Sequence, residues 1–218
     1  MEINAILEQF GLTPPFTTEK APTGLIHKTY FVRATEGEFV AQQLHEVVRT
    51  ETCEDAKVVT DFARERGVTV PEFLVTAAGK PWVQHEGALW RVMKRLGGES
   101  YDTVDSSNKA YNAARLIGQF HTALKGSNYQ CRGSIPHFHD TPYIFDQFKK
   151  VVEIHRASEK YQKVSEDVEY LIEQIQQEFL PQGLPRQIVH GDLKISNFLF
   201  SGNDALGLLD FDTCMNHS

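Results

Sequence analysis

The residue types best suited to chemistry lie near the end of the chain. Asp192 follows a short apolar run, Asn197 comes five residues later, and Asp210 ends a second apolar run. Phosphoryl transfer from ATP needs one carboxylate that orients the attacking hydroxyl and accepts its proton. It also needs an amide and a second carboxylate that hold magnesium. We therefore predict Asp192 to be the catalytic base and Asn197 and Asp210 to be the metal ligands, with ATP and Mg²⁺ as cofactors.

Three neighbouring residues have supporting or alternative roles. Asp212 faces the same way as Asp210 if the strand continues, and it could be a second metal contact or a contact to a substrate hydroxyl. His190 is expected to brace the loop, because Asp192 already serves as the base. Lys194 either neutralises charge on the transferred phosphoryl group or is a solvated surface lysine.

The first part of the chain carries mostly strand-like patterns. Ile3–Phe10 predicts a short helix, and Thr52 and Asp55 are expected to cap a helix that runs to Arg66 and ends at Gly67. Strands are predicted for five runs: Lys28–Ala34, Glu38–Leu44, Glu72–Thr76, Pro81–Gln84 and Ala88–Leu96. These elements are expected to form a small antiparallel sheet that carries one helix, so residues 1–96 are predicted to be one β-rich lobe.

After Gly97 the pattern becomes helical. Apolar residues at helical spacing predict a helix from Ala110 to Leu124, a second helix from about Pro142, and a third from Ser165 to about Phe179. The last segments, Asn197–Phe200 and Ala205–Asp210, predict a hairpin that brings Asp210 beside Asn197. Residues 97–218 are thus a mainly helical lobe, and the fold class is α+β with two lobes.

Composition excludes several classes of protein. The net charge of −7 argues against a nucleic-acid partner. Three widely separated cysteines predict free thiols rather than a disulfide framework or a zinc site. The N-terminus does not resemble a signal peptide, and no apolar run is long enough to span a membrane. We therefore expect a cytoplasmic protein with no membrane partner, whereas the oligomeric state is not indicated.

Two runs, HGDLKISN at 190–197 and LLDFDT at 208–213, resemble the aminoglycoside phosphotransferase/choline kinase superfamily, which has the protein-kinase-like fold. Segments 24–30, 39–44, 90–93 and 135–142 are similar to the branch that contains N-acetylhexosamine 1-kinase. The resemblance implies a small-molecule kinase whose acceptor is a hydroxyl of a sugar, amino sugar or amino alcohol. Choline, aminoglycoside and homoserine kinases stay open. A protein kinase is disfavoured, because Asp210-Phe211-Asp212 replaces Asp-Phe-Gly.

The same resemblance implies a nucleotide site in the first lobe. Residues 24–29 would form the loop over the phosphates, Val40 and Ala41 would pack on the adenine, and Met93 to Leu96 would form the hinge. Gln43 stands where many kinases place a lysine, which puts the usual lysine–glutamate pair in doubt. The full set of expected nucleotide-binding residues is Gly24, His27, Lys28, Thr29, Val40, Ala41, Gln43, Met93, Lys94, Arg95 and Leu96.

The chain ends eight residues after Asp210, whereas the resembling enzymes continue with helices that build much of the acceptor pocket. We therefore expect a C-terminally truncated domain with an incomplete helical lobe. The loop with His137, His139 and Asp140 either faces the substrate or is polar surface. A second hypothesis, favoured by Gln43 and the early end, is a non-catalytic, pseudokinase-like nucleotide-binding module. The intact set of Asp192, Asn197 and Asp210 argues against it.

Overall fold

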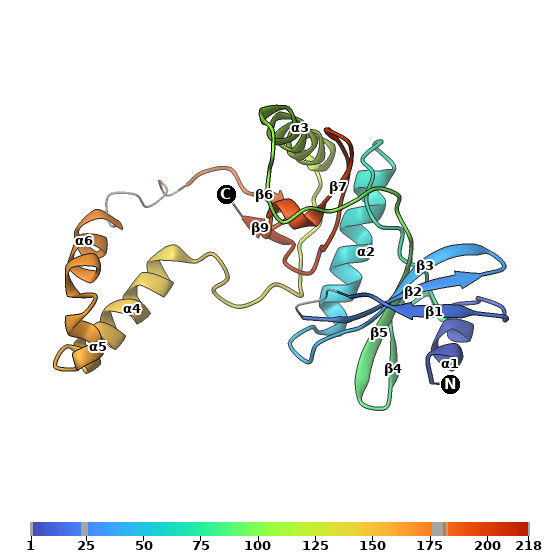
Figure 1. Ribbon diagram of the computed structural model, residues 1–218, viewed down its shortest axis with the longest axis horizontal. Coiled ribbons are helices and arrows are strands. Elements are labelled where there is room, and N and C mark those ends of the chain that lie inside the picture. The colour runs from blue at the N-terminus through green and yellow to red at the C-terminus, as the bar shows by residue number, and fades with distance from the viewer. Residues whose placement is uncertain (1, 23–25, 176–180, 182, 218) are drawn as a thin grey trace. The chain divides into compact units, whose positions relative to one another are not determined.

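The structure is a computed structural model that describes residues 2–22, 26–175, 181 and 183–217. The chain forms two compact units, one made of Met1–Ser134 with Arg186–His217 and one made of Ile135–Pro185 (Figure 1). The predicted α+β class is confirmed by an antiparallel sheet in the first unit and helices in both. The expected lobe boundary at residue 96 falls inside the first unit and stays a prediction.

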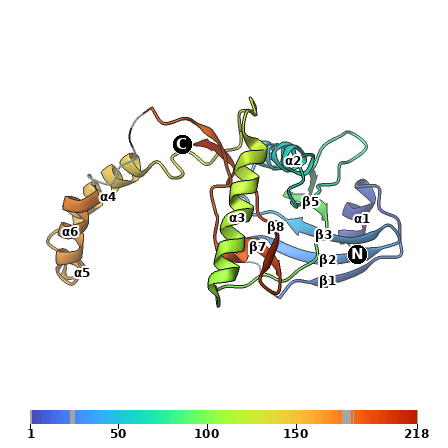
Figure 2. The ribbon, with the colours of Figure 1, turned by 90° about the horizontal axis from the view of Figure 1, so that it is seen from above.

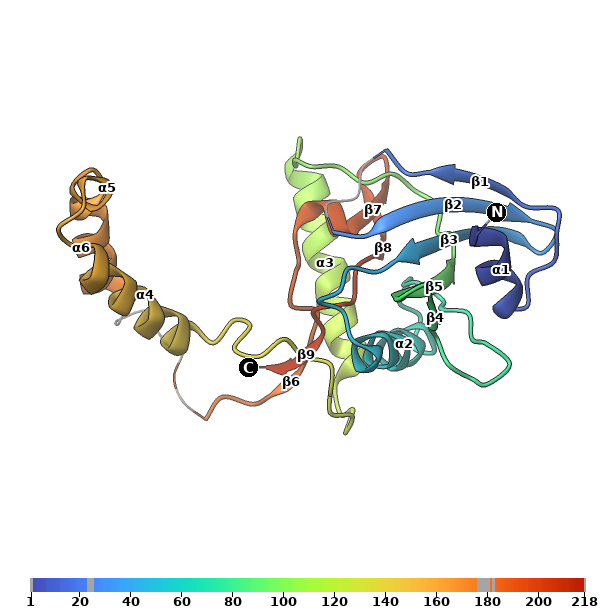
Figure 3. The same cartoon turned by 90° about the horizontal axis from the view of Figure 1, so that it is seen from below.

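Five strands form the main sheet in the order β1-β2-β3-β5-β4, and every neighbouring pair is antiparallel. Figure 3 shows β1, β2 and β3 side by side. The strands are β1 (Thr17–Lys20), β2 (Lys28–Ala34), β3 (Gly37–Gln43), β4 (Val83–His85) and β5 (Ala88–Lys94). Alternate residues such as Phe39, Ala41 and Val92 are buried on one face against helix α1 (Glu2–Gln9). This packing explains why the sequence alternates in β3.

The largest core of the first unit joins two helices to a hairpin. The helices are α2 (Thr50–Arg64) and α3 (Ser107–Leu124), and the hairpin strands are β7 (Phe198–Ser201) and β8 (Asp204–Leu208). Val59, Phe120 and Phe211 are among the almost fully buried side chains in this core. Figure 2 shows α3 lying beside β7 and β8. Burial of each such side chain contributes about 1.5–3 kcal/mol, which fixes the hairpin that leads to Asp210.

A second, two-stranded sheet pairs β6 (Gln187–Val189) with β9 (Met215–His217). Asn216 is central to it, because the Asn216 side chain accepts the N–H of Cys131 at 2.8 Å and donates to the carbonyl of Tyr129 at 3.0 Å. The carbonyl of Asn216 also accepts from Arg186 Nη2 at 2.6 Å. The stretches that precede and follow the second unit in the sequence are therefore both tied to one residue of β9.

The described part of the second unit contains the helices α4 (Thr141–His155), α5 (Glu159–Gln162) and α6 (Ser165–Ile175). Asp140 caps α4 by accepting the N–H of Tyr143 at 3.1 Å, and Ser158 caps α5 by accepting the N–H of Tyr161. The expected continuation of the last helix to Phe179 lies outside the described residues. No helix within the described ranges combines the length and the apolar character needed to cross a membrane.

Two local predictions were wrong, and one strand was not predicted. Helix α2 begins at Thr50, and its N-cap is Arg49, so Thr52 and Asp55 do not cap it. Residues 72–76 do not form a strand, because only Phe73 makes an isolated bridge, to Met93. Strand β1 was not predicted, since Thr-Thr-Glu-Lys is a polar and largely exposed edge strand.

Candidate active site

The segment that carries Asp192 begins at the end of β6 with a sharp turn at Gly191. This glycine has φ +82°, and a Cβ atom here would lie 2.3 Å from the carbonyl oxygen of Thr213. Only glycine fits, because both the left-handed backbone and the close approach exclude a side chain. The hydroxyl of Thr213 donates to the carbonyl of His190 at 2.8 Å. The turn therefore brings the start of the segment that carries Asp192 against the residues after Asp210.

His190 is fully buried and uses both ring nitrogens. Its Nε2 donates to the carbonyl of Leu209 at 2.8 Å, and its Nδ1 accepts the N–H of Asp192 at 3.3 Å. These partners define a neutral imidazole with its proton on Nε2. Burial lowers the pKa of His190, against smaller opposing effects from its hydrogen bond and nearby carboxylates. His190 thus braces the loop between Asp192 and Leu209.

Asn197 holds Asp192 in place. In the short helix η1 (Ile195–Asn197), its Nδ2 donates to the backbone carbonyl of Asp192 at 2.8 Å and to Oδ2 of the same residue at 3.2 Å. Both partners are acceptors, so the amide orientation is fixed and Oδ1 of Asn197 lies on the opposite side. Lys194 Nζ also donates to Asp192 Oδ2, at 2.6 Å. The side chain of Asp192 remains 34% exposed, which leaves the carboxylate accessible to a substrate.

Asp210 directly follows the hairpin in a left-handed conformation, with φ +62°. The preceding residue, Leu209, donates its N–H to the carbonyl of Asn197 at 2.8 Å. A backbone hydrogen bond therefore ties Asn197 to Leu209, the residue before Asp210, which connects the segments that carry the two proposed metal ligands. They offer an amide and a carboxylate oxygen, which suits Mg²⁺, because this ion takes few protein ligands and keeps several waters. The described residues contain no cluster of three or more His, Cys, Asp or Glu side chains placed for a metal.

Asp212 forms a buried ion pair. Arg91 contacts both of its carboxylate oxygens, with Nη2 at 3.0 Å from Oδ2, and His27 Nε2 lies 2.8 Å from the same Oδ2. Burial alone would raise the pKa of Asp212, but the charge of Arg91 and the hydrogen bonds from His27 and Arg91 hold it well below its usual range. The contacts described for Asp212 are thus with Arg91 and His27, and its role toward a metal or a substrate hydroxyl stays a prediction.

The residues expected to cover the phosphates are only partly described. Gly24 lies outside the described residues. Lys28 is exposed at the start of β2, and Thr29 accepts from Gln42 Nε2 at 3.3 Å. His27 Nε2 contacts Asp212, and its expected contact with the nucleotide stays a prediction. Of the expected phosphate loop, residues 26–29 are therefore described, whereas residues 24 and 25 are not.

The expected adenine contacts need correction. Val40 and Ala41 are neighbours on β3 and face opposite sides of the sheet, so they cannot pack together on one face of the base. Ala41 is fully buried on the α1 side, whereas Val40 packs against the larger core and pairs with Met93. Gln43 shares the face of Ala41. Of this pair, Val40 alone remains a candidate for the adenine contact.

The backbone of the expected hinge is largely occupied. Lys94 donates its N–H to the carbonyl of Glu72 at 2.9 Å, and Arg95 donates its N–H to the carbonyl of Glu38 at 3.0 Å. Leu96 is the hinge residue whose backbone N–H has no such protein acceptor among the described hydrogen bonds. It is therefore the candidate donor to an adenine edge.

The loop before α4 is built by local contacts. His137 stacks on Tyr143 with ring centroids 3.6 Å apart, and its Nδ1 lies 3.0 Å from Asp140 Oδ2. His137 and His139 both have left-handed backbone conformations, with φ 57° and 60°. These residues therefore shape the start of α4, which is sufficient to account for the polar residues noticed in the sequence.

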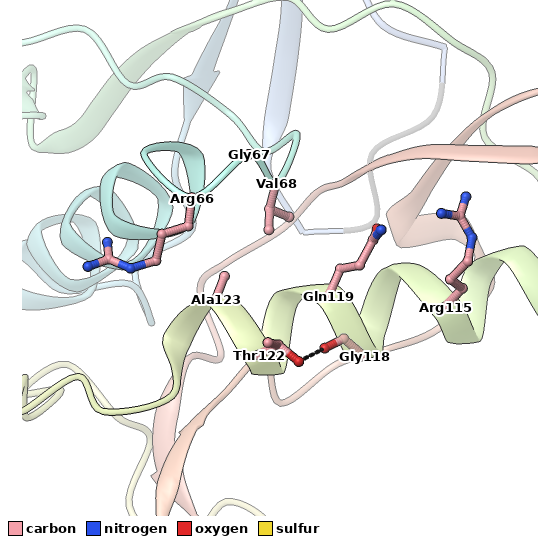
Figure 4. Close-up of a pocket in the computed structure, with 8 residues that line it drawn as sticks. All are labelled: Arg66, Gly67, Val68, Arg115, Gly118, Gln119, Thr122 and Ala123. Atoms are coloured by element: carbon pink, nitrogen blue, oxygen red, sulfur yellow. Dashed lines mark hydrogen bonds between the residues drawn. The ribbon is translucent and has the colours of Figure 1, made fainter.

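A surface cavity of about 660 Å³ lies away from these residues (Figure 4). It runs between α3 and the turn after α2, and its lining includes Arg66, Val68, Arg115 and Gln119. None of the predicted site residues lines it. This cavity is therefore not the predicted site.

Sequence reasoning did not single out Arg91 or assign a contact to Gln42. Arg91 is 2% exposed in a strand whose neighbours Trp90 and Val92 are also buried. A charge inside an apolar strand requires a partner, so this pattern could have indicated a buried ion pair. The identity of the partner, far along the chain, could not be read from the pattern.

Comparison with known proteins identifies the class to which this fold and these residues belong. A model of the phosphotransferase enzyme family matches residues 17–217, so the chain belongs to this family. The predicted superfamily is thereby confirmed.

Several solved structures are similar. An amicoumacin kinase in complex with AMP-PNP, Ca²⁺ and its ligand Ami is 16% identical, with a TM-score of 0.67, over 100% of this chain and 66% of that chain. An aminoglycoside phosphotransferase from Alicyclobacillus acidocaldarius is 14% identical, with a TM-score of 0.64, over 98% of this chain and 66% of that chain. A spectinomycin phosphotransferase in complex with ADP and spectinomycin is 11% identical, with a TM-score of 0.61, over 98% and 68%.

At these identities the likeness establishes the fold, and the predicted kinase-like fold is confirmed. The chain spans 66% of the length of the first two of these structures.

Proposed function

We propose that this chain carries the nucleotide- and metal-binding site of a small-molecule kinase that transfers the γ-phosphoryl group of ATP to a hydroxyl group. The observation that supports this best is the arrangement around Asp192. Its carboxylate is fixed by Asn197 and Lys194 and yet remains one-third exposed. A general base must be oriented and also reachable by the acceptor, and Asp192 meets both requirements.

In this proposal Asp192 orients the acceptor hydroxyl and takes its proton as the oxygen attacks the γ-phosphorus. Oδ1 of Asn197 and the carboxylate of Asp210 hold Mg²⁺, which neutralises charge on the phosphates when it is bound. The hydrogen bond to Asp192 raises the pKa of Lys194, so this side chain stays protonated and adds positive charge beside the base. Val40 and the hinge at Leu96 are the proposed adenine contacts.

We further propose that the acceptor is a sugar or amino sugar. Support comes from the resemblance of segments 24–30, 39–44, 90–93 and 135–142 to the N-acetylhexosamine 1-kinase branch. The similar structures include kinases whose ligands are amicoumacin and spectinomycin, which are small molecules. Free thiols at Cys53, Cys131 and Cys214 favour the cytoplasm, where ATP is also available.

A non-catalytic nucleotide-binding module is the second candidate. One observation favours it, namely that β3 supplies no lysine on either face. Gln43, which the resemblance places where many kinases have the phosphate-gripping lysine, shares the sheet face of Ala41, and on the other face Gln42 donates to Thr29 and accepts from Arg91. Such a module would bind the nucleotide without turnover.

Turnover assays separate the two candidates. The full chain is incubated with Mg²⁺ and ATP against a panel of sugars, amino sugars and amino alcohols, and ADP release is measured. We expect acceptor-dependent turnover that the Asp192→Asn variant loses by a factor of about 10² to 10⁴, as for removal of a general base. Asp102→Asn, which changes an exposed aspartate, is the matched control. Nucleotide binding without turnover on any acceptor would favour the module.

A further inference from the structure

We propose that Arg91 is the positioning residue of the metal site, because it fixes the turn of Asp210 through its ion pair with Asp212. This inference rests on the proposed function, in which Asp210 is a metal ligand. Arg91 lies on β5 and touches none of the reacting groups itself. Its effect is transmitted along two residues of backbone, from Asp212 to Asp210.

All three nitrogens of the Arg91 guanidinium donate hydrogen bonds to side chains. Nη1 and Nη2 each donate to one carboxylate oxygen of Asp212, and Nε donates to Gln42 Oε1 at 2.8 Å. The side chain of Arg91 is 3% exposed and that of Asp212 is 11% exposed. A forked, buried pair of this kind fixes both distance and orientation, which a single contact cannot do.

Asp210 needs such support because its backbone is strained. A non-glycine residue in the left-handed region costs about 1 kcal/mol or more and persists only where its surroundings hold it. On one side, Leu209 is held by its contacts with His190 and Asn197. On the other side, Asp212 is held by Arg91 and His27. Asp210 thus lies between two anchors.

The same contacts reach the strands next to the expected phosphate loop. Gln42 joins Arg91 to Thr29 on β2, and His27 joins Asp212 to the segment after β3, because its Nδ1 accepts the N–H of His45 at 3.2 Å. This second contact leaves the proton of a neutral His27 on Nε2, where it donates to Asp212. One hydrogen-bonded network therefore holds the turn at residues 210–212, which carries the proposed metal ligand Asp210, together with strands β2, β3 and β5.

Stability alone does not account for the pair. Replacing a buried ion pair with apolar residues is often neutral or stabilising, because burying two charges costs nearly as much as their attraction returns. A planar fork, on the other hand, fixes a carboxylate in one orientation. Gln43 of β3 faces away from Asp212. The buried cation beside the turn at residues 210–212 is therefore Arg91, which lies on β5.

Metal binding by the full chain tests the role of Arg91. Binding of Mn²⁺ in the presence of a non-hydrolysable ATP analogue is measured by electron paramagnetic resonance, and binding of the analogue in EDTA is measured separately. The variants are Arg91→Lys, Asp212→Asn and the double variant Arg91→Met/Asp212→Asn, which leaves no unpaired buried charge. Arg33→Met, at an exposed arginine of β2, is the control.

We expect the double variant to weaken Mn²⁺ binding about tenfold or more, as is usual when the supports of a metal ligand are removed, with little change in metal-free nucleotide binding. Asp212→Asn alone should show the same loss, and Arg91→Lys a partial one. Wild-type Mn²⁺ affinity in a folded double variant or in folded Asp212→Asn would overturn the inference but leave the proposed function intact. If the wild-type chain binds neither nucleotide nor Mn²⁺, both are overturned.

Discussion

Asp55 of helix α2 accepts the backbone N–H of Gly133 at 2.6 Å, across a separation of 78 residues in the sequence. Its carboxylate also accepts the N–H of Arg132 at 2.7 Å and the hydroxyl of Tyr129 at 2.6 Å. Thr52, one turn earlier, donates to the carbonyl of Gly133 at 3.0 Å. Helix α2 therefore holds the loop after α3 through side chains that the sequence suggested were helix caps.

Replacing Asp55 with Asn should destabilise the chain by about 3 kcal/mol. The variant puts an NH₂ group among three donors, and each hydrogen bond to a buried charged group contributes about 1.5–3 kcal/mol. The free energy of unfolding in urea measures the effect. Glu54→Gln, which changes the exposed partner of Arg132, should stay within about 0.5 kcal/mol of wild type. Equal effects of the two variants would show that the buried carboxylate is not the source of the stability.

Gly191→Ala should cost clearly more than Gly79→Ala. Both glycines have positive φ, +82° and +75°, but a Cβ at Gly191 meets the Thr213 carbonyl whereas Gly79 has open space. Left-handed strain alone costs about 1–2 kcal/mol, and the clash at Gly191 adds to it by displacing the turn before Asp192. Urea unfolding and nucleotide turnover of both variants measure this. Similar stability and turnover in the two variants would contradict the close approach.

Stability should fall as the pH drops below about 6.5. The pKa of His190 is lowered by burial from its ordinary value of 6.5, so the unfolded chain takes up a proton before the folded chain does. The contribution of His190 is thus fully present above pH 6.5 and is lost as the pH falls towards its folded pKa. The loss is at most about 1.4 kcal/mol per pH unit.

Urea unfolding between pH 7.5 and 5 gives this dependence. The His190→Gln variant should be less stable at pH 7.5 but show a flatter curve. Burial also lowers the pKa of His121, which contributes equally to both proteins and cancels in the comparison. An unchanged slope in His190→Gln would assign the pH dependence to other groups.

Asn197→Asp should separate metal binding from catalysis. The variant keeps an oxygen for the metal, but it loses both donors to Asp192 and sets two carboxylates about as close as the present 3.2 Å contact. Repulsion between like charges then disturbs the proposed base. We expect turnover to fall about 100-fold while Mn²⁺ affinity stays within about threefold of wild type. Asn108→Asp, at an exposed position of α3, is the control, and parallel losses of turnover and Mn²⁺ affinity would contradict the separate roles.

Local patterns were sufficient for the long elements. The alternation in Lys28–Ala34 and the helical spacing up to Leu124 predicted β2 and α3 to within a few residues. The pairing of strands β6 and β9 could not be predicted, because each strand has only three residues and the two lie far apart in the sequence. Polar β1 has no apolar alternation to reveal it.

In the candidate site, too, the local contacts could be predicted and the long-range contacts could not. Spacing alone brought Asp192 and Asn197 together, since they lie in one local segment whose hydrogen bonds close within five residues. The partners of Asp212 could not be predicted, because Arg91 and His27 reach it from 121 and 185 residues away. Residue type indicates the need for a partner, whereas the tertiary fold selects which partner is used.

The stretches that precede and follow the second unit are both hydrogen-bonded to Asn216, and this has a consequence for how the family can diversify. A segment whose two ends are held close together can be exchanged or lengthened at a small entropic cost, because closing a longer loop adds only about 0.6 kcal/mol per doubling of its length. Residues 135–185 leave and re-enter the first unit at such a closed point. A longer or foreign insert at this point would therefore add little loop-closure entropy.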